Sequence, residues 1–140
     1  MSSKVEKRFR GYIFSRPFMG ERVPQHVQNI VIRDYCSKKD FQYLLSATEY
    51  AMENSALMLR QLVKDLASID GIVAYSMLQM PEDDDERQSI FNIILSCKKE
   101  IHFAVEGLSL NDMSSYDHVE SIWQVKKTLP SCYFNETLQN

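Results

Sequence analysis

The chain has 140 residues, 44% of them hydrophobic and 25% charged, which suits one domain burying roughly 68–70% of its unfolded surface and is too short for two. Lys and Arg number 16 against 19 Asp and Glu, a formal net charge of −3, so no global positive field favours nucleic acid. No apolar run approaches the roughly 20 residues that cross a bilayer, and no apolar segment follows the basic N-terminus. We expect a cytoplasmic protein without membrane insertion.

The first predicted strand covers residues 10–15 and ends before Pro17, because proline cannot donate to a strand ladder. Pro24 suits the first position of a helix that ends near Lys38. The apolar residues at helical spacing predict its buried stripe as Val27, Ile30, Val31 and Tyr35.

The second predicted strand covers residues 41–47 and is followed by a loop over residues 48–54. Asn54 or Ser55 is placed to cap the next helix. The buried stripe of this helix is predicted as Leu59, Leu62, Val63 and Leu66. A turn at residues 70–71 then leads into a third strand over residues 72–78.

The acidic run at residues 82–86 and the lysines at 98–99 suit the two ends of a third helix, by complementing its dipole. Its buried face is predicted as Ile90, Ile93, Ile94 and Cys97. A fourth strand follows at residues 101–105, and Ser114 or Ser115 opens a last helix that closes near Pro130. That helix is predicted to carry the apolar residues Val119, Ile122 and Trp123.

This alternation of strands and helices predicts an α/β fold. We expect a three-layer, flavodoxin-like sandwich with a small, mostly parallel four-stranded sheet and helices on both faces. A single domain spans residues 1–130, and residues 131–140 form a flexible tail.

Ligands of open parallel sheets bind beyond the carboxyl ends of the strands. The residues predicted to bind a ligand at that edge are Ser15, Arg16, Phe18, Arg22, Gln25, Asn29, Arg33, Ser46, Thr48 and Tyr50. The candidates for proton transfer are His26, Glu49 and Glu106. His26, Asn29 and Arg33 recur at helical spacing and therefore share one face of the first helix. In the alternative interpretation, Arg16 pairs with Glu49 or Glu106 and only holds the loops together.

The sequence gives weaker signals for nucleotide-binding loops, metal sites and reactive cysteines. The four glycines, at positions 11, 20, 71 and 107, cannot build a Walker or dinucleotide loop. The histidines show no metal-ligand spacing with cysteine, so we expect no cofactor and no metal. His102 is predicted to be a packed or edge residue of its strand. Cys36 and Cys97 are predicted to be small core residues that stay as thiols.

Several unusual stretches match together, at residues 10–18, 22–29, 33–36, 43–52 and 100–107. They resemble the sporadic carbohydrate cluster protein family over about residues 9–110. Members of that family are small bacterial proteins encoded among genes for surface sugars, in lipopolysaccharide, O-antigen or capsule clusters. The resemblance implies a pathway more firmly than a reaction.

The order of strands and helices, with a Gly-Tyr pair in the first strand, is also similar to the catalytic domain of serine recombinases, or resolvases. Their mechanism needs Tyr-x-Arg-x-Ser there, but counting from Tyr12 these positions hold Phe14 and Arg16, and Ser15 faces the other side of the strand. The Asp-Arg pair after the third strand is absent from residues 76–80. This similarity implies the fold without DNA recombination.

Together these observations predict a protein of bacterial surface-carbohydrate biosynthesis that binds or acts on a sugar-linked anionic metabolite, such as a nucleotide sugar. Arg16 and Arg22 would hold the anionic group. The sugar hydroxyls would be bound by Gln25, Asn29, Ser46 and Thr48. Whether a reaction follows is left open. The alternative is a non-catalytic module that docks on another enzyme of the pathway or forms a homodimer.

Overall fold

The structure is a computed structural model that describes residues 6–18, 22–49 and 56–139, with side chains up to residue 128. Its strands are β1 (Arg8–Phe14), β2 (Gln42–Glu49), β3 (Gly71–Ala74), β4 (Glu100–Phe103) and β5 (Leu108–Leu110). Its α-helices are α1 (Gln25–Lys38), α2 (Leu57–Lys64), α3 (Asp84–Ser96) and α4 (Met113–Gln139). Two short 3₁₀ helices are η1 (Leu66–Ser68) and η2 (Met77–Gln79).

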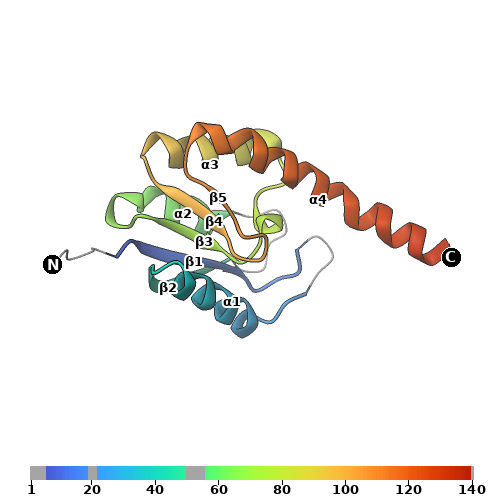
Figure 1. Cartoon of the computed structure of the whole chain (residues 1–140), viewed down its shortest axis with the longest axis horizontal. Coiled ribbons are helices and arrows are strands. Elements are labelled where there is room, and N and C mark those ends of the chain that lie inside the picture. The colour runs from blue at the N-terminus through green and yellow to red at the C-terminus, as the bar shows by residue number, and fades with distance from the viewer. Residues whose placement is uncertain (1–5, 19–21, 50–55, 140) are drawn as a thin grey trace.

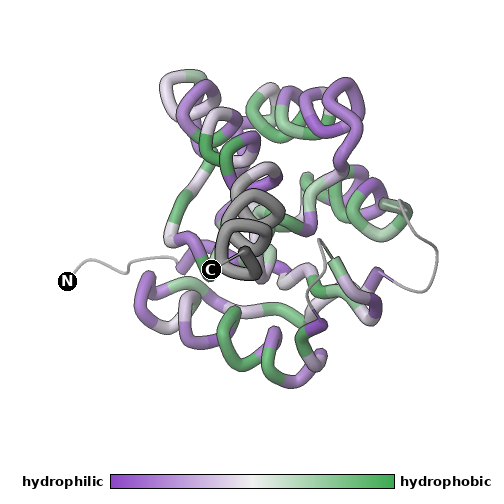
Figure 2. The backbone as a smooth tube through the Cα atoms, turned by 90° about the vertical axis from the view of Figure 1, so that its right-hand side faces the viewer, coloured by the Kyte–Doolittle hydropathy of each residue, from purple (hydrophilic) through white to green (hydrophobic). Residues whose placement is uncertain are grey.

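The strands form one sheet in the order β2-β1-β3-β4-β5, in which only β5 runs antiparallel to its neighbour. Helix α1 covers one face of this sheet, and α2, α3 and α4 lie on the other (Figure 1). Figure 2 shows the same layers from the side. The predicted α/β class with a mostly parallel sheet and helices on both faces is confirmed, but the sheet has five strands instead of four.

The fifth strand lies where the sequence predicted a loop. Gly107 adopts a left-handed backbone, with φ of 65°, and its N–H donates to the carbonyl of Phe103 at 2.9 Å. This tight turn folds Leu108–Leu110 back onto β4 in register with residues 101–103. A three-residue strand is too short for an alternating pattern to reveal it.

The ends of two other strands differ from prediction. Strand β2 continues through Glu49, so Thr48 and Glu49 lie in a strand and not in a loop. Strand β3 ends at Ala74, where a strand to residue 78 was predicted, because Ser76 caps η2 by accepting from the N–H of Leu78 at 3.1 Å. The predicted caps at residues 54 and 55 lie outside the described residues.

The core on the α1 face consists of Phe9, Ile13, Ile32, Cys36 and Val73. The buried residues of α1 itself are Gln28, Ile32 and Cys36. The predicted stripe was wrong at Ile30, which is 60% exposed. The true stripe has the spacing i, i+4, i+8 and begins with a glutamine, which a search for apolar residues excludes.

The buried face of α3 also differs, since it consists of Arg87, Ile90, Phe91 and Ile94. Ile93 is 43% exposed and Cys97 is exposed, so both were wrongly placed in the core. The helix ends at Ser96, and Lys98 has a left-handed φ of 60° that turns the chain toward β4. The prediction for Cys36 is confirmed, because its side chain is buried.

Of the three cysteines in the sequence, Cys36 and Cys97 should therefore react differently. Burial raises the pKa of Cys36 to about 11, so its reactive thiolate is scarce near neutral pH. Brief treatment of the folded protein with iodoacetamide is expected to alkylate Cys97 and spare Cys36, as read by mass spectrometry of the digested protein. Denaturation before treatment should make both react. Equal labelling in the folded protein would contradict the burial of Cys36.

The last helix, α4, buries Val119 and Trp123 against the sheet, as predicted. It begins after Asp112, whose carboxylate accepts from the N–H of Ser115 at 2.9 Å. The predicted end near Pro130 was wrong, because the helix continues to Gln139. A proline removes one hydrogen bond of a helix, and the turns on either side of it can still form. The flexibility predicted for residues 131–140 stays a prediction.

Candidate functional site

The strand order places the topological switch point of the sheet between β1 and β3. The chain leaves β1 toward α1 on one face and leaves β3 toward η2 and α3 on the other (Figure 1). A ligand of such a sheet is expected at the carboxyl ends of these two strands. The predicted site residues that the structure describes separate into several groups around this edge.

A chain of buried amides fills the switch point itself. Gln28, which is fully buried, accepts from the N–H of Phe14 at 3.0 Å and donates to the carbonyls of Phe14 and Val23 at 2.9 and 2.8 Å. Gln79, 2% exposed, donates to the side-chain oxygen of Gln28 at 2.8 Å. The end of β1 and the start of α1 are therefore held in place. Sequence reasoning placed Gln79 in the loop after the third strand, at this edge, but it missed Gln28, which stands in no motif.

The Glu49 cluster lies at the carboxyl ends of β1 and β2. The carboxylate of Glu49, 2% exposed, accepts from the phenol of Tyr12 at 2.9 Å and from the backbone N–H groups of Met58 and Leu59 at 3.0 and 3.3 Å. It thus occupies the N-terminus of α2, where the helix dipole favours a negative charge. Burial and the nearby carboxylate raise the pKa of Tyr12 above its ordinary range. Several hydrogen bonds of the fold therefore depend on Glu49.

The loop after β1 presents Arg16 beside this cluster. Its guanidinium lies over the ring of Phe14, with Cζ 4.2 Å from the ring centroid. Ser15 donates from its hydroxyl to the carbonyl of Glu49 at 3.1 Å. Phe18 is only 4% exposed and packs edge-on against Phe14 and Tyr75. The structure therefore gathers Ser15, Arg16 and Phe18 at the switch point, as predicted for a parallel sheet.

The Glu106 cluster lies at the carboxyl ends of β3 and β4. Glu106, whose side chain is 5% exposed, accepts from the hydroxyl of Ser76 at 2.8 Å, the N–H of Met77 at 3.0 Å and the ammonium of Lys126 at 2.7 Å. This carboxylate joins the segment after β3 to α4. Sequence reasoning missed Lys126, because only the fold brings α4 to this edge.

The bulge cluster lies on the α1 face of β2. The pairing of β1 with β2 shifts between Arg10 and Tyr12, so that Gly11 lies opposite a bulge of two residues, 45 and 46. Ser46 donates from Oγ to Oδ1 of Asn29 at 2.7 Å, and the Tyr43 hydroxyl lies 2.8 Å from Ser46 Oγ. These polar side chains link the bulged strand to α1.

The remaining predicted residues are more dispersed. Arg22 is exposed in the loop before α1, and Gln25 and His26 are exposed in its first turn. Their side chains make no hydrogen bond or ion pair with another described residue. Thr48 is half-buried on β2, and Tyr50 lies outside the described residues. The structure thus brings Asn29 and Ser46 together but separates them from Glu49 and Glu106.

Neither a family model nor a curated protein matches the chain. A solved structure does match, the crystal structure of a resolvase family site-specific recombinase from Streptococcus pneumoniae, with a TM-score of 0.61 over 93% of this chain and 95% of that chain. The chain has a resolvase-like fold. At 8% sequence identity the likeness extends to the fold alone. The resemblance to sporadic carbohydrate cluster proteins stays a prediction.

A second polar network of the resolvase-like fold lies at the opposite, amino edge of the sheet. His102, 5% exposed, lies with Nδ1 2.6 Å from the hydroxyl of Tyr35 and with Nε2 2.8 Å from Glu100. The other oxygen of Glu100 accepts from Lys7 at 2.7 Å. His102 is therefore a packed residue of its strand, as predicted, and it connects α1 to β4.

This network should make the protein sensitive to acid. The hydrogen bonds that Glu100 accepts from His102 and Lys7 lower its pKa to about 2, from an ordinary value of 4.5. A lowered pKa stabilises the fold above pH 4.5, and this contribution, up to about 3 kcal/mol, is lost as the pH falls from about 4.5 toward 2. Urea unfolding at a series of pH values is expected to show that loss. Glu100→Gln should flatten the dependence, and an unchanged slope in this variant would contradict the assignment.

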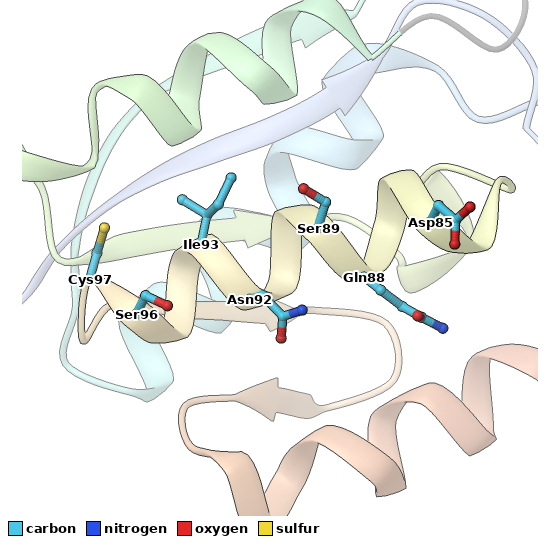
Figure 3. A pocket seen from close by; sticks show the side chains of 7 residues that line it. All are labelled: Asp85, Gln88, Ser89, Asn92, Ile93, Ser96 and Cys97. Atoms are coloured by element: carbon cyan, nitrogen blue, oxygen red, sulfur yellow. The ribbon is translucent and has the colours of Figure 1, made fainter.

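A shallow hollow of about 480 Å³ lies along α3. Figure 3 shows its lining side chains along this one helix, with Asp85 at one end and Cys97 at the other. The carboxylate of Asp85 and the thiol of Cys97 are too far apart on the helix to act on one ligand atom. Among the described residues no group of three histidine, cysteine or acidic side chains could hold a metal ion, and no helix there is long and apolar enough to cross a membrane.

Proposed function

We propose that the protein binds a sugar-linked anionic metabolite at the carboxyl edge of its sheet, within bacterial surface-carbohydrate biosynthesis. The observation that carries the binding site is the position of Arg16, on the loop that leaves β1 at the switch point between β1 and β3. The exposed Arg22 follows on the same loop. The pathway rests on the sequence resemblance to the sporadic carbohydrate cluster family.

Binding is better supported than catalysis. Glu49 and Glu106 each accept several hydrogen bonds from the protein, which engages the oxygens that an acid or base would use. His26 is exposed in the first turn of α1, so it remains the candidate for any proton transfer. We therefore assign a ligand class and no reaction.

A thermal-shift screen of the purified protein tests this proposal. Nucleotide sugars, sugar phosphates and free acidic sugars are added in turn, and a ligand raises the melting temperature according to its concentration relative to Kd. Arg16→Ala is expected to remove most of the shift while the unliganded melting temperature stays close to that of the parent protein. Lys64→Ala, at the far end of α2, removes the same charge and should bind normally.

Three outcomes would overturn the proposal. In the first, Arg16→Ala binds with unchanged affinity. In the second, no compound of the panel binds the parent protein, which would favour the alternative of a docking module. Equal losses in Arg16→Ala and Lys64→Ala would indicate a general charge effect and not a site.

One observation favours the docking alternative. Helix α4 has 27 residues, a length of about 40 Å, and its C-terminal part extends away from the sheet (Figure 1). A helix without packed neighbours is marginally stable in water, so this part is suited to a partner or a second copy. Light scattering over a range of protein concentrations tests self-association. Val125→Glu, at a position 58% exposed on α4, should weaken any dimer formed through this helix.

A further inference from the structure

The bulge in β2 places a serine hydroxyl where a side chain of β1 would ordinarily lie. A Cβ atom on Gly11 would come within 2.0 Å of Ser46 Oγ and 3.2 Å of the Tyr43 ring. Only glycine at position 11 leaves room for this hydroxyl. Bulges of this kind redirect side chains and are common beside binding sites.

The hydroxyl of Ser46 fixes the orientation of the Asn29 side chain. Ser46 Oγ gives its one hydrogen to Oδ1 of Asn29 at 2.7 Å, and the Tyr43 hydroxyl lies 2.8 Å from Oγ and 3.3 Å from the same Oδ1. Tyr43 also accepts from the N–H of Ser46 at 3.2 Å. This closed ring uses the oxygen of Asn29. No described residue accepts a hydrogen bond from Nδ2, so its two N–H donors are open.

Arg33 lies one helical turn further along α1, and Cζ is 5.3 Å from the centroid of the Tyr43 ring. It is exposed and forms no ion pair with a described residue. The neighbouring acid, Asp34, instead pairs with Lys38 at 3.0 Å. The open polar groups of Asn29 and Arg33 are therefore all donors, and Arg33 adds a full positive charge.

We propose that Asn29 and Arg33, supported by Tyr43, form a binding site for a carboxylate or phosphate group carried on a small organic molecule. The planar guanidinium of Arg33 pairs with the oxyanion, and the Asn29 amide donates to it or to an adjacent hydroxyl. Because two hydroxyls already hold the Asn29 side chain in place, ligand binding costs little further side-chain entropy there. This site needs neither Arg16 nor Arg22, so it stands apart from the proposed function.

Nuclear magnetic resonance with ¹⁵N-labelled protein tests the site directly. The side-chain amide signals of Asn29 and the Nε–H signal of Arg33 are followed during titration with glucuronate, glucose 1-phosphate, inorganic phosphate or glucose at constant ionic strength. Glucuronate or glucose 1-phosphate is expected to move both sets of signals, and neutral glucose is expected to leave them in place. Inorganic phosphate shows whether the anion alone is sufficient.

Asn29→Asp is the informative variant. Its carboxylate still accepts from both hydroxyls, which preserves the ring, but it removes the open donors and repels an anion. We expect this variant and Arg33→Gln each to weaken binding at least about tenfold. Lys38→Gln, an equal charge change on the same helix, should bind as the parent protein does. In Arg16→Ala the signals of Asn29 and Arg33 should still move during the titration, whether or not a ligand is lost from the carboxyl edge.

Several outcomes would overturn the inference. The site is absent if no anion moves the Asn29 and Arg33 signals, or if Asn29→Asp binds as tightly as the parent protein. Equal losses in Lys38→Gln and Arg33→Gln would show a general field instead of a site. Loss of these signal changes in Arg16→Ala would assign the ligand to the carboxyl edge, a result that supports the proposed function and contradicts this second site.

Discussion

Replacing Arg87 by Ala is expected to lower the free energy of unfolding by about 3–5 kcal/mol, the range found when one partner of a buried ion pair is removed. Arg87 is fully buried, although it belongs to α3 close to a run of acidic residues. Its Nε lies 3.1 and 3.0 Å from the two oxygens of Glu120, and its Nη2 donates to Glu120 and Asp84. Its Cζ also lies 3.7 Å from the centroid of the Trp123 ring. The variant would leave Glu120 without its guanidinium and open a cavity above Trp123.

Urea unfolding of the two proteins measures this loss. Lys127→Ala is a matched control, since its ammonium lies 5.0 Å from the centroid of the same Trp123 ring but the residue is exposed. Its expected cost is below about 1 kcal/mol. Combining Arg87→Met with Glu120→Gln should recover part of the loss, because the second change removes the unpaired charge. A cost for Arg87→Ala as small as that for Lys127→Ala would contradict the buried pair.

Replacing Glu49 by Ala is expected to cost about 2–4 kcal/mol, because it leaves buried donors unpaired. The phenol of Tyr12 and the N–H groups of Met58 and Leu59 all donate to this carboxylate. Tyr12→Phe removes one donor of the same set and should cost only about 1 kcal/mol. The difference between the two losses of unfolding free energy then measures how much the Glu49 carboxylate stabilises the start of α2.

Thermal and urea unfolding give both values, and Glu82→Ala serves as the control, because Glu82 is exposed and its carboxylate makes no hydrogen bond with a described residue. The experiment also bears on catalysis. If Glu49→Ala unfolds as easily as predicted, Glu49 is required for the fold whatever else it does. Unchanged stability would mean that the carboxylate is held less firmly, and its predicted role in proton transfer would gain support.

The sequence was sufficient to predict the fold class, because strands and helices alternate clearly along it. Only short or irregular elements were missed by the prediction. Three-residue β5 has no period to detect, and the end of β3 depends on the cap at Ser76. Buried faces were less predictable. Gln28 and Arg87 are buried because hydrogen-bonding or charged partners inside the fold satisfy their polar groups. A hydropathy pattern shows only that the two residues are polar.

The candidate site was predictable to a similar degree. Helical spacing correctly placed Asn29 and Arg33 on one face of α1, since both reach Tyr43. The carboxyl-edge rule correctly gathered Ser15 and Arg16. What the sequence could not supply was the separation of the groups, because alternate residues of a strand face opposite sides and the bulge at residues 45–46 changes that alternation locally.

Gln28 has one further consequence, for how the protein opens. Strand β3 stops beside Tyr12, and beyond this point the amide of Gln28 pairs with both the N–H and the carbonyl of Phe14, as a neighbouring strand would. A helix side chain thus extends the sheet by one residue. Helix α1 cannot separate from the sheet without breaking these hydrogen bonds at the end of β1. The two elements therefore melt as one unit, and a partial opening that frees the helix alone is unfavourable.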